Sequence, residues 1–197
     1  MIRIGILGDI GSGKSYIAKN FGYPVFNADE EVAKIYKNNK KVFKKLKKNL
    51  PKYINTFPVN KSELTKAILS NRINLKKIVK IVHLEVKKKM NVFIKKNKNK
   101  KFIILDIPLL LENKINKKND VLVFVCTKKK DVLKRLKRRE NYNKALIDKF
   151  KNLQLPLVYK MKKSHFIIKN NFTKKLVNKS INEILKKINN ERNYSRY

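Results

Sequence analysis

The chain has 197 residues and a formal net charge of +37, with 51 lysine and arginine residues against 14 acidic ones. This length fits one domain, and a hydrophobic fraction of 42% can still form a core. No apolar run approaches the roughly 20 residues of a membrane span, the first residues lack the pattern of a signal peptide, and the single cysteine, Cys126, excludes a disulfide framework. We therefore expect one cytoplasmic domain over residues 1–197, a monomer or weak homo-oligomer with no membrane partner.

The high positive charge has two interpretations. Lysine and arginine neutralise phosphates, which favours a protein that binds nucleic acid. However, the lysines are spread over nearly every predicted helix, and there are no repeats of aromatic and basic residues that would stack on bases. The abundance of Lys, Asn and Ile is instead typical of an AT-rich genome. We expect weak, salt-sensitive adsorption to RNA but no specific nucleic-acid partner.

Short apolar segments predict the strands of a sheet, and several are continuous runs of the kind found in parallel sheets covered on both faces. The predicted strands are 2–7, 24–27, 102–105, 121–125 and 166–168. Apolar residues at helical spacing predict helices over 13–21, from near 29, from 62, and over 75–94, 129–139, 142–153 and 173–188. The lysine-rich residues 37–61 contain two prolines, and no helix is predicted there. Strands that alternate with helices predict a three-layer α/β fold with a parallel sheet.

Residues 8–15, Gly-Asp-Ile-Gly-Ser-Gly-Lys-Ser, match the phosphate-loop pattern G-x-x-x-x-G-K-[ST] between a predicted strand and a predicted helix. The chain has five glycines, and four of them (Gly5, Gly8, Gly11 and Gly13) fall within nine residues. Glycines let successive backbone N–H groups point at phosphate oxygens. Lys14 can reach the β- and γ-phosphates, and the Ser15 hydroxyl can ligate Mg²⁺. The motif therefore predicts binding of ATP with Mg²⁺ but does not identify the acceptor.

Two acidic residues lie where predicted strands end, which is where ligands bind in open α/β sheets. Asp29 follows the second strand, so it can accept a proton from a substrate hydroxyl or can cap the next helix. Asp106 closes the third strand, so it can hold Mg²⁺ directly or through water, or can cap the next turn. The residues alone leave both pairs of alternatives open.

A basic helix after the fourth strand carries Arg135, Arg138 and Arg139. The planar guanidinium suits phosphates, although a solvated helix face is the better explanation for at least one of the three. His83 lies near the apolar stripe of the long helix, where a lone histidine is more often a packed residue than a catalyst.

Together these residues resemble the dephospho-CoA kinase family over nearly the whole chain. The matching segments are 8–15, Asn27-Ala28-Asp29, Val82-His83-Leu84, Pro108-Leu109-Leu110-Leu111-Glu112-Asn113, Leu133-Lys134-Arg135 with Arg139, Gln154, and 166–170. The chain departs from the family pattern at Tyr16, Asn27, Leu84 and His165. Asn27 replaces an aspartate, so one of two carboxylates is lost while Asp29 remains. These departures bear on substrate contacts and leave the reaction class unchanged.

The resemblance implies a P-loop kinase fold of about five parallel strands, with a helical acceptor-binding lobe at 58–98 and a lid at 129–153. It implies ATP-dependent phosphorylation of the 3′-hydroxyl of dephospho-CoA, the last step of coenzyme A synthesis. The implied catalytic residues are Asp29, Lys14 and Arg139. The implied nucleotide-binding residues are Gly8, Gly11, Ser12, Gly13, Lys14, Ser15, Tyr16 and Asn170. The implied acceptor-binding residues are His83, Leu109 and Arg135, and the implied Mg²⁺ ligands are Ser15 and Asp106.

Two other functions remain open on the sequence. One is another small-molecule or nucleotide kinase on the same core, since a fold does not fix its substrate. The other is a P-loop ATPase associated with RNA or DNA, for which the charge is the argument. A nucleotide-binding module without activity is disfavoured, because Lys14, Ser15 and Asp29 are all present.

Overall fold

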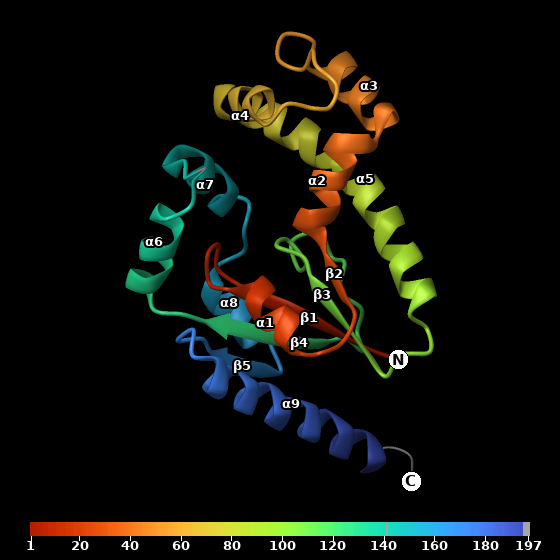
Figure 1. The fold of residues 1–197 in the computed structure, drawn as a ribbon, viewed down its shortest axis with the longest axis vertical. Coiled ribbons are helices and arrows are strands. Elements are labelled where there is room, and N and C mark those ends of the chain that lie inside the picture. The colour runs from red at the N-terminus through yellow and green to blue at the C-terminus, as the bar shows by residue number, and fades with distance from the viewer. Residues whose placement is uncertain (141, 195–197) are drawn as a thin grey trace. The chain divides into compact units, whose positions relative to one another are not determined.

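The computed structural model describes residues 1–140 and 142–194 (Figure 1). Contacts between residues divide the chain into two compact units. The first unit contains residues 1–26, 99–142 and 155–197, and the second contains residues 27–98 and 143–154. The chain therefore leaves the first unit twice, once after residue 26 and once after residue 142.

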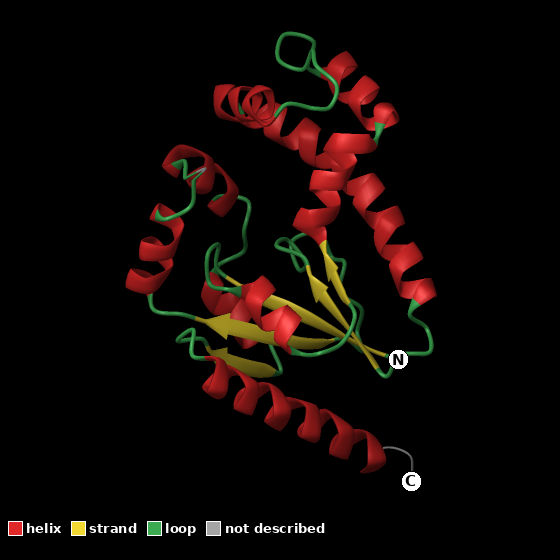
Figure 2. Ribbon diagram, in the orientation of Figure 1, coloured by secondary structure: helices red, strands yellow, loops and turns green. Residues whose placement is uncertain are grey.

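The described part of the chain contains one five-stranded sheet in the order β2-β3-β1-β4-β5 (Figure 2). Its strands are β1 Ile2–Gly8, β2 Val25–Asn27, β3 Phe102–Asp106, β4 Val121–Cys126 and β5 Phe166–Lys169. Strand β1 pairs in parallel with β3 and with β4, and β4 pairs in parallel with β5. The parallel register brings the carboxyl ends of these strands to one edge of the sheet.

The two faces of β1 are covered by different elements. Side chains at alternate positions point to opposite faces of a strand. Ile2, Ile4 and Ile6 belong to a buried apolar cluster with helices α1 (Lys14–Asn20) and α9 (Lys174–Tyr194). On the opposite face Gly5 is in close contact with Leu110, and helix α8 (Leu157–Lys162) also contacts β1. Helices thus cover both faces, which confirms the three-layer α/β fold.

Helix α6 (Lys129–Lys137) follows β4 and completes the described helices of the first unit. The helices of the second unit are α2 (Ala28–Asn38), α3 (Lys40–Asn49), α4 (Lys61–Ser70), α5 (Arg72–Lys96) and α7 (Lys144–Lys151). The long helix α5 packs against α2, α3 and α4, and α4 also packs against α7.

Asparagine begins every described helix of the second unit. In each case the asparagine side chain accepts a hydrogen bond from a backbone N–H in the first turn, which satisfies a donor that has no partner within the helix. These capping residues are Asn27, Asn39, Asn60, Asn71 and Asn143. The abundance of asparagine in this sequence is thus used locally to define helix starts.

All five predicted strands are confirmed to within one residue at each end, because each is a short, mostly apolar segment. Two described helices were not predicted. Helix α3 lies in the lysine-rich residues 37–61, where the buried Val42 and Leu46 are separated by exposed lysines. Helix α8 has six residues, too few for a helical period to be recognised. No helix in the described residues is long and apolar enough to cross a membrane.

Candidate active site

The phosphate loop connects β1, which ends at Gly8, to α1, which begins at Lys14. Gly11 and Gly13 have φ values of 82° and 90°, in the left-handed region that favours glycine. A Cβ at Gly13 would also collide with the Asn170 amide, and one at Gly11 would lie 2.9 Å from Leu136 Cγ. Both the backbone conformation and the close packing therefore require glycine here, as the sequence predicted.

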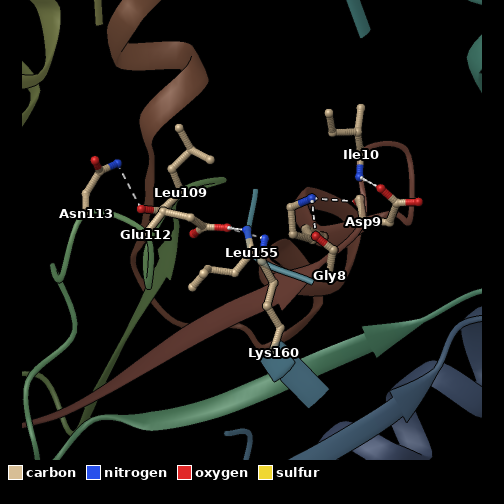
Figure 3. A network of polar contacts seen from close by, with 9 residues as sticks. Gly8, Asp9, Ile10, Leu109, Glu112, Asn113, Leu155 and Lys160 are labelled. Atoms are coloured by element: carbon tan, nitrogen blue, oxygen red, sulfur yellow. Dashed lines mark hydrogen bonds and ion pairs between the residues drawn. The ribbon is translucent and has the colours of Figure 1, made fainter. Parts of the chain in front are cut away.

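Lys14 lies at the first position of α1 and its side chain folds back on the loop. Its Nζ donates to the carbonyl oxygens of Asp9 (2.8 Å) and Gly8 (3.3 Å), while Asp9 Oδ1 accepts from the Ile10 N–H at 2.7 Å (Figure 3). The ammonium group is thus held within the loop by neutral acceptors. A phosphate is a stronger acceptor for a charged donor than a carbonyl is, so this lysine is suited to bind one.

The next two residues of α1 differ in environment. The Ser15 side chain is exposed in the first turn. Tyr16 is half-buried and packs against the apolar cluster of the first unit. The structure therefore gives Ser15 a position open to a ligand, whereas Tyr16 contributes to the core.

The backbone of the loop is held from outside by two side chains. Asn170 Nδ2 and Thr127 Oγ1 each donate to the Ser12 carbonyl oxygen at 2.9 Å. Asn170 is buried and follows β5, and Thr127 follows β4. Asn170 was expected near the base of ATP, and the structure brings it to the phosphate loop itself. Thr127 was missed, although its place at the end of a strand adjacent to β1 could have indicated it.

Helix α6 packs directly on the loop. The side chains of Val132 and Leu136 are the nearest neighbours of Gly11. On the same helix the Arg135 guanidinium lies 3.9 Å from the centre of the Phe172 ring. Arg138 and Arg139 are exposed. Arg135, which stacks on an aromatic ring, thus has a different environment from the two exposed arginines Arg138 and Arg139.

Asp106 is buried at the carboxyl end of β3, the strand next to β1. The phosphate loop follows the carboxyl end of β1, so Asp106 and the loop lie at the same edge of the sheet. A carboxylate and the Ser15 hydroxyl supply the hard oxygen ligands that Mg²⁺ prefers, usually with several waters. The residues present therefore fit a Mg²⁺ ion.

Asp29 lies in the second unit, in the first turn of α2, and is exposed. The alternative that Asp29 caps this helix is wrong: Asn27 is the capping residue, and its side chain accepts from the Glu30 N–H at 3.0 Å. The departure at Asn27 is therefore compatible with a structural role. Asp29 instead adds negative charge near the positive end of the helix dipole.

His83 is half-buried on α5, and burial lowers its pKa from the ordinary value of 6.5. Its neighbour Leu84 is exposed. His83 and Asp29 both belong to the second unit, whereas the phosphate loop belongs to the first.

The segment after Asp106 contains a buried ion pair that sequence reasoning missed. Glu112 Oε1 contacts Lys160 Nζ at 2.6 Å and accepts from the Leu155 N–H at 2.9 Å (Figure 3). Both charged side chains are almost fully buried, with exposed fractions of 9% for Glu112 and 1% for Lys160. In the same segment the Leu109 carbonyl oxygen accepts from Asn113. In a lysine-rich chain nothing in the sequence distinguishes Lys160 from the solvated lysines.

The family model for dephospho-CoA kinase matches residues 2–175. The chain belongs to this family. The dephospho-CoA kinase of Wolbachia sp. subsp. Brugia malayi (strain TRS) is 34% identical over 187 residues, which cover 92% of this chain and 95% of that protein. The resemblance found in the sequence is thus confirmed: the chain is an ATP-dependent kinase of coenzyme A synthesis.

Solved structures support the fold. A crystal structure from Thermus thermophilus has a TM-score of 0.74 at 24% identity and covers 94% of this chain and 97% of its own. The dephospho-CoA kinase from Campylobacter jejuni has a TM-score of 0.62 at 21% identity, with 96% and 98% covered. These likenesses confirm the P-loop kinase fold.

Proposed function

We propose that this dephospho-CoA kinase uses the loop 8–15 to hold ATP and Asp29 to activate the 3′-hydroxyl of dephospho-CoA. The observation that carries the proposal is the phosphate loop, in which left-handed glycines and a folded-back Lys14 form a cradle for an anion. Backbone N–H groups at a helix start favour phosphate by hydrogen bonding and by the helix dipole.

In the proposed reaction the acceptor oxygen forms a bond to the γ-phosphorus while the bond from that phosphorus to the β,γ-bridging oxygen breaks. ADP leaves, and the hydroxyl proton passes to the Asp29 carboxylate. Lys14 and the loop N–H groups stabilise the negative charge spread over the transferring group. Bound Mg²⁺, held by Ser15 and by Asp106 directly or through water, would neutralise charge on the β- and γ-phosphates.

The acceptor is assigned to the second unit. Residues 58–98, with His83 on α5, would form the lobe that binds dephospho-CoA, and Leu109 would contact the acceptor from the first unit. Residues 129–153 would form a lid, from which Arg139 would reach the phosphates and help exclude water. Support for these roles comes from the match of each residue to the family pattern and from the exposed side chain of Arg139.

The test is a coupled assay of ADP release with a panel of acceptors: dephospho-CoA, adenosine, AMP, shikimate and water. We expect turnover that depends on dephospho-CoA and little with the others. Lys14→Ala is the negative control, because it removes the charge in the loop. Turnover with another acceptor and none with dephospho-CoA would overturn the proposed substrate while keeping the kinase fold.

A further inference from the structure

Helix α8 has an inverted distribution of side chains. A surface helix of a globular protein ordinarily buries its apolar side chains and exposes its charged ones. In α8 the buried residue is instead Lys160, which is held by the ion pair with Glu112. The apolar side chains of this helix are all exposed, and they are Leu157, Val158, Tyr159 and Met161. The helix is therefore anchored by a charge while its apolar side chains face solvent.

The strand that follows α8 adds to this apolar surface. Strand β5 lies at the edge of the sheet, and its residue Ile167 is 50% exposed. The adjacent Ile168 belongs to the buried cluster that includes α9, so Ile167 points to the other face of the sheet, where α8 packs on β1. We call this set of exposed apolar residues the α8 surface: Leu157, Val158, Tyr159, Met161 and Ile167.

The α8 surface is bordered by lysines. Lys162 ends α8, Lys163 follows it, and Lys169 lies on the same face of β5 as the exposed isoleucine; all three are exposed. Lys163 Nζ lies 5.8 Å from the centre of the Tyr159 ring, so the lysine side chain extends along an apolar neighbour. Residues 155–182 contain no Asp or Glu. The surface thus combines apolar side chains with positive charge.

We propose that the α8 surface docks on an anionic phospholipid bilayer, with its apolar side chains at the boundary of the acyl chains and its lysines among the headgroups. Tyrosine favours this interfacial position, and anionic headgroups attract lysine. A second copy is a poorer partner, because each copy has a net charge of +37 and residues 155–182 offer no carboxylate. RNA would neutralise the lysines but would leave the apolar side chains in water.

The directions of the side chains favour a bilayer over an acidic protein. Successive side chains of a helix are turned by about 100°, so Val158, Tyr159 and Met161 point in different directions around the axis of α8. A groove on a protein covers one face of a helix, whereas a fluid interface can surround it. Such docking is peripheral, whereas the expectation of no membrane partner rested on the absence of an apolar run long enough to span a bilayer.

The first test measures binding of the full chain to sedimented vesicles. Vesicles of phosphatidylcholine are compared with vesicles of phosphatidylcholine and phosphatidylglycerol in equal parts. We expect binding to the anionic vesicles, part of which persists at moderate salt, where purely electrostatic adsorption is screened. Val158→Ser should weaken this binding about tenfold. Val92→Ser is the matched control, because Val92 on α5 is 64% exposed against 59% for Val158, and it should bind like the parent protein.

The second test changes the charge. Lys162→Gln combined with Lys163→Gln should weaken binding to anionic vesicles by about fivefold per lysine. Lys174→Gln combined with Lys175→Gln removes the same charge from exposed positions of α9, on the other face of the sheet, and should have a smaller effect. Equal effects of the two pairs would mean that the basic chain adsorbs in any orientation, which would overturn the proposal.

The third test reports insertion directly. The chain contains no tryptophan, so Val158→Trp introduces a single fluorophore on α8. We expect its emission to shift to shorter wavelength when anionic vesicles are added, and we expect no shift for Val92→Trp. An unchanged emission of Val158→Trp would overturn the proposal, even if the chain sediments with the vesicles.

Vesicle binding that Val158→Ser leaves unchanged would also exclude the bilayer as the partner of this surface. The surface would then belong to a second copy or to an acidic protein. Sedimentation velocity distinguishes these two, since only a second copy produces self-association that Val158→Ser weakens. If Val158→Ser lowers the midpoint of thermal unfolding, the lysine pairs and the tryptophan variants decide in its place.

Discussion

The side-chain amide of Asn170 donates to the Ser12 carbonyl oxygen, linking the end of β5 to the phosphate loop across 158 residues of sequence. Thr127 donates to the same oxygen. The loop conformation is thus fixed by two adjacent strands as well as by its own glycines.

Asn170→Ala should therefore weaken ATP binding. Loss of a hydrogen bond of this kind typically costs about 1 kcal/mol, so we expect the KM for ATP to rise several-fold while the KM for the acceptor stays constant. Asn171→Ala is the matched control, because Asn171 is exposed and its side chain only accepts from the Thr173 N–H. Equal effects of the two substitutions would contradict a specific role for Asn170.

Breaking the Glu112–Lys160 pair should strongly destabilise the protein. Both side chains are almost fully buried, and a buried charge left without its partner typically costs about 3–5 kcal/mol. We expect Lys160→Met to lower the free energy of unfolding by about this amount in urea titrations. Lys34→Met removes an exposed ion pair with Glu31, so it should change stability by no more than about 1 kcal/mol. Similar losses in both variants would contradict this account.

The stability of the protein should depend on the titration of His83. Burial lowers its pKa, so between the lowered value and 6.5 the unfolded chain binds more protons than the folded one. The free energy of unfolding therefore rises with pH through this window and falls as pH drops through it. His83→Gln should flatten this rise on the acid side of pH 6.5 in urea titrations. Leu84→Gln, an exposed neighbour, should retain it.

The charge of +37 should cause only adsorption to nucleic acid. We expect fluorescence anisotropy to detect RNA binding at low salt, with an affinity that falls linearly in a log–log plot as salt rises. RNA should not stimulate ATP hydrolysis. Stimulation that persists at moderate salt would instead favour a nucleic-acid-dependent ATPase.

The fold was largely predictable because most of its strands are continuous apolar runs and its glycines are scarce outside the loop. Contacts between distant residues were not predictable in the same way. The Glu112–Lys160 pair joins residues 48 positions apart, and only the tertiary structure distinguishes this lysine from the many that are exposed. The left-handed backbone of Phe172 likewise leaves no signal in the sequence, since most residues with that conformation are glycine or asparagine.

The parts of the candidate site that are contiguous in the sequence were predictable, whereas those formed by distant residues were not. The phosphate loop is a contiguous motif, and the structure gives it the expected glycine conformations. In the sequence, Asn27 stood out only because it replaces an aspartate of the family pattern. Its role as the cap of α2 became evident only from the start of that helix in the structure. The roles of Asp29, Arg139 and His83 in the reaction remain predictions.

The central claim is that Asp29 activates the 3′-hydroxyl of dephospho-CoA for attack on ATP held in the loop. The most direct measurement is kcat for formation of coenzyme A, quantified by mass spectrometry, in the parent protein and in Asp29→Asn, with Glu30→Gln as the exposed neighbouring control. We expect Asp29→Asn to lower kcat by about 10²–10⁴-fold without weakening ADP binding, and Glu30→Gln to retain activity. An unchanged kcat in Asp29→Asn, or no coenzyme A from the parent protein, would contradict the account.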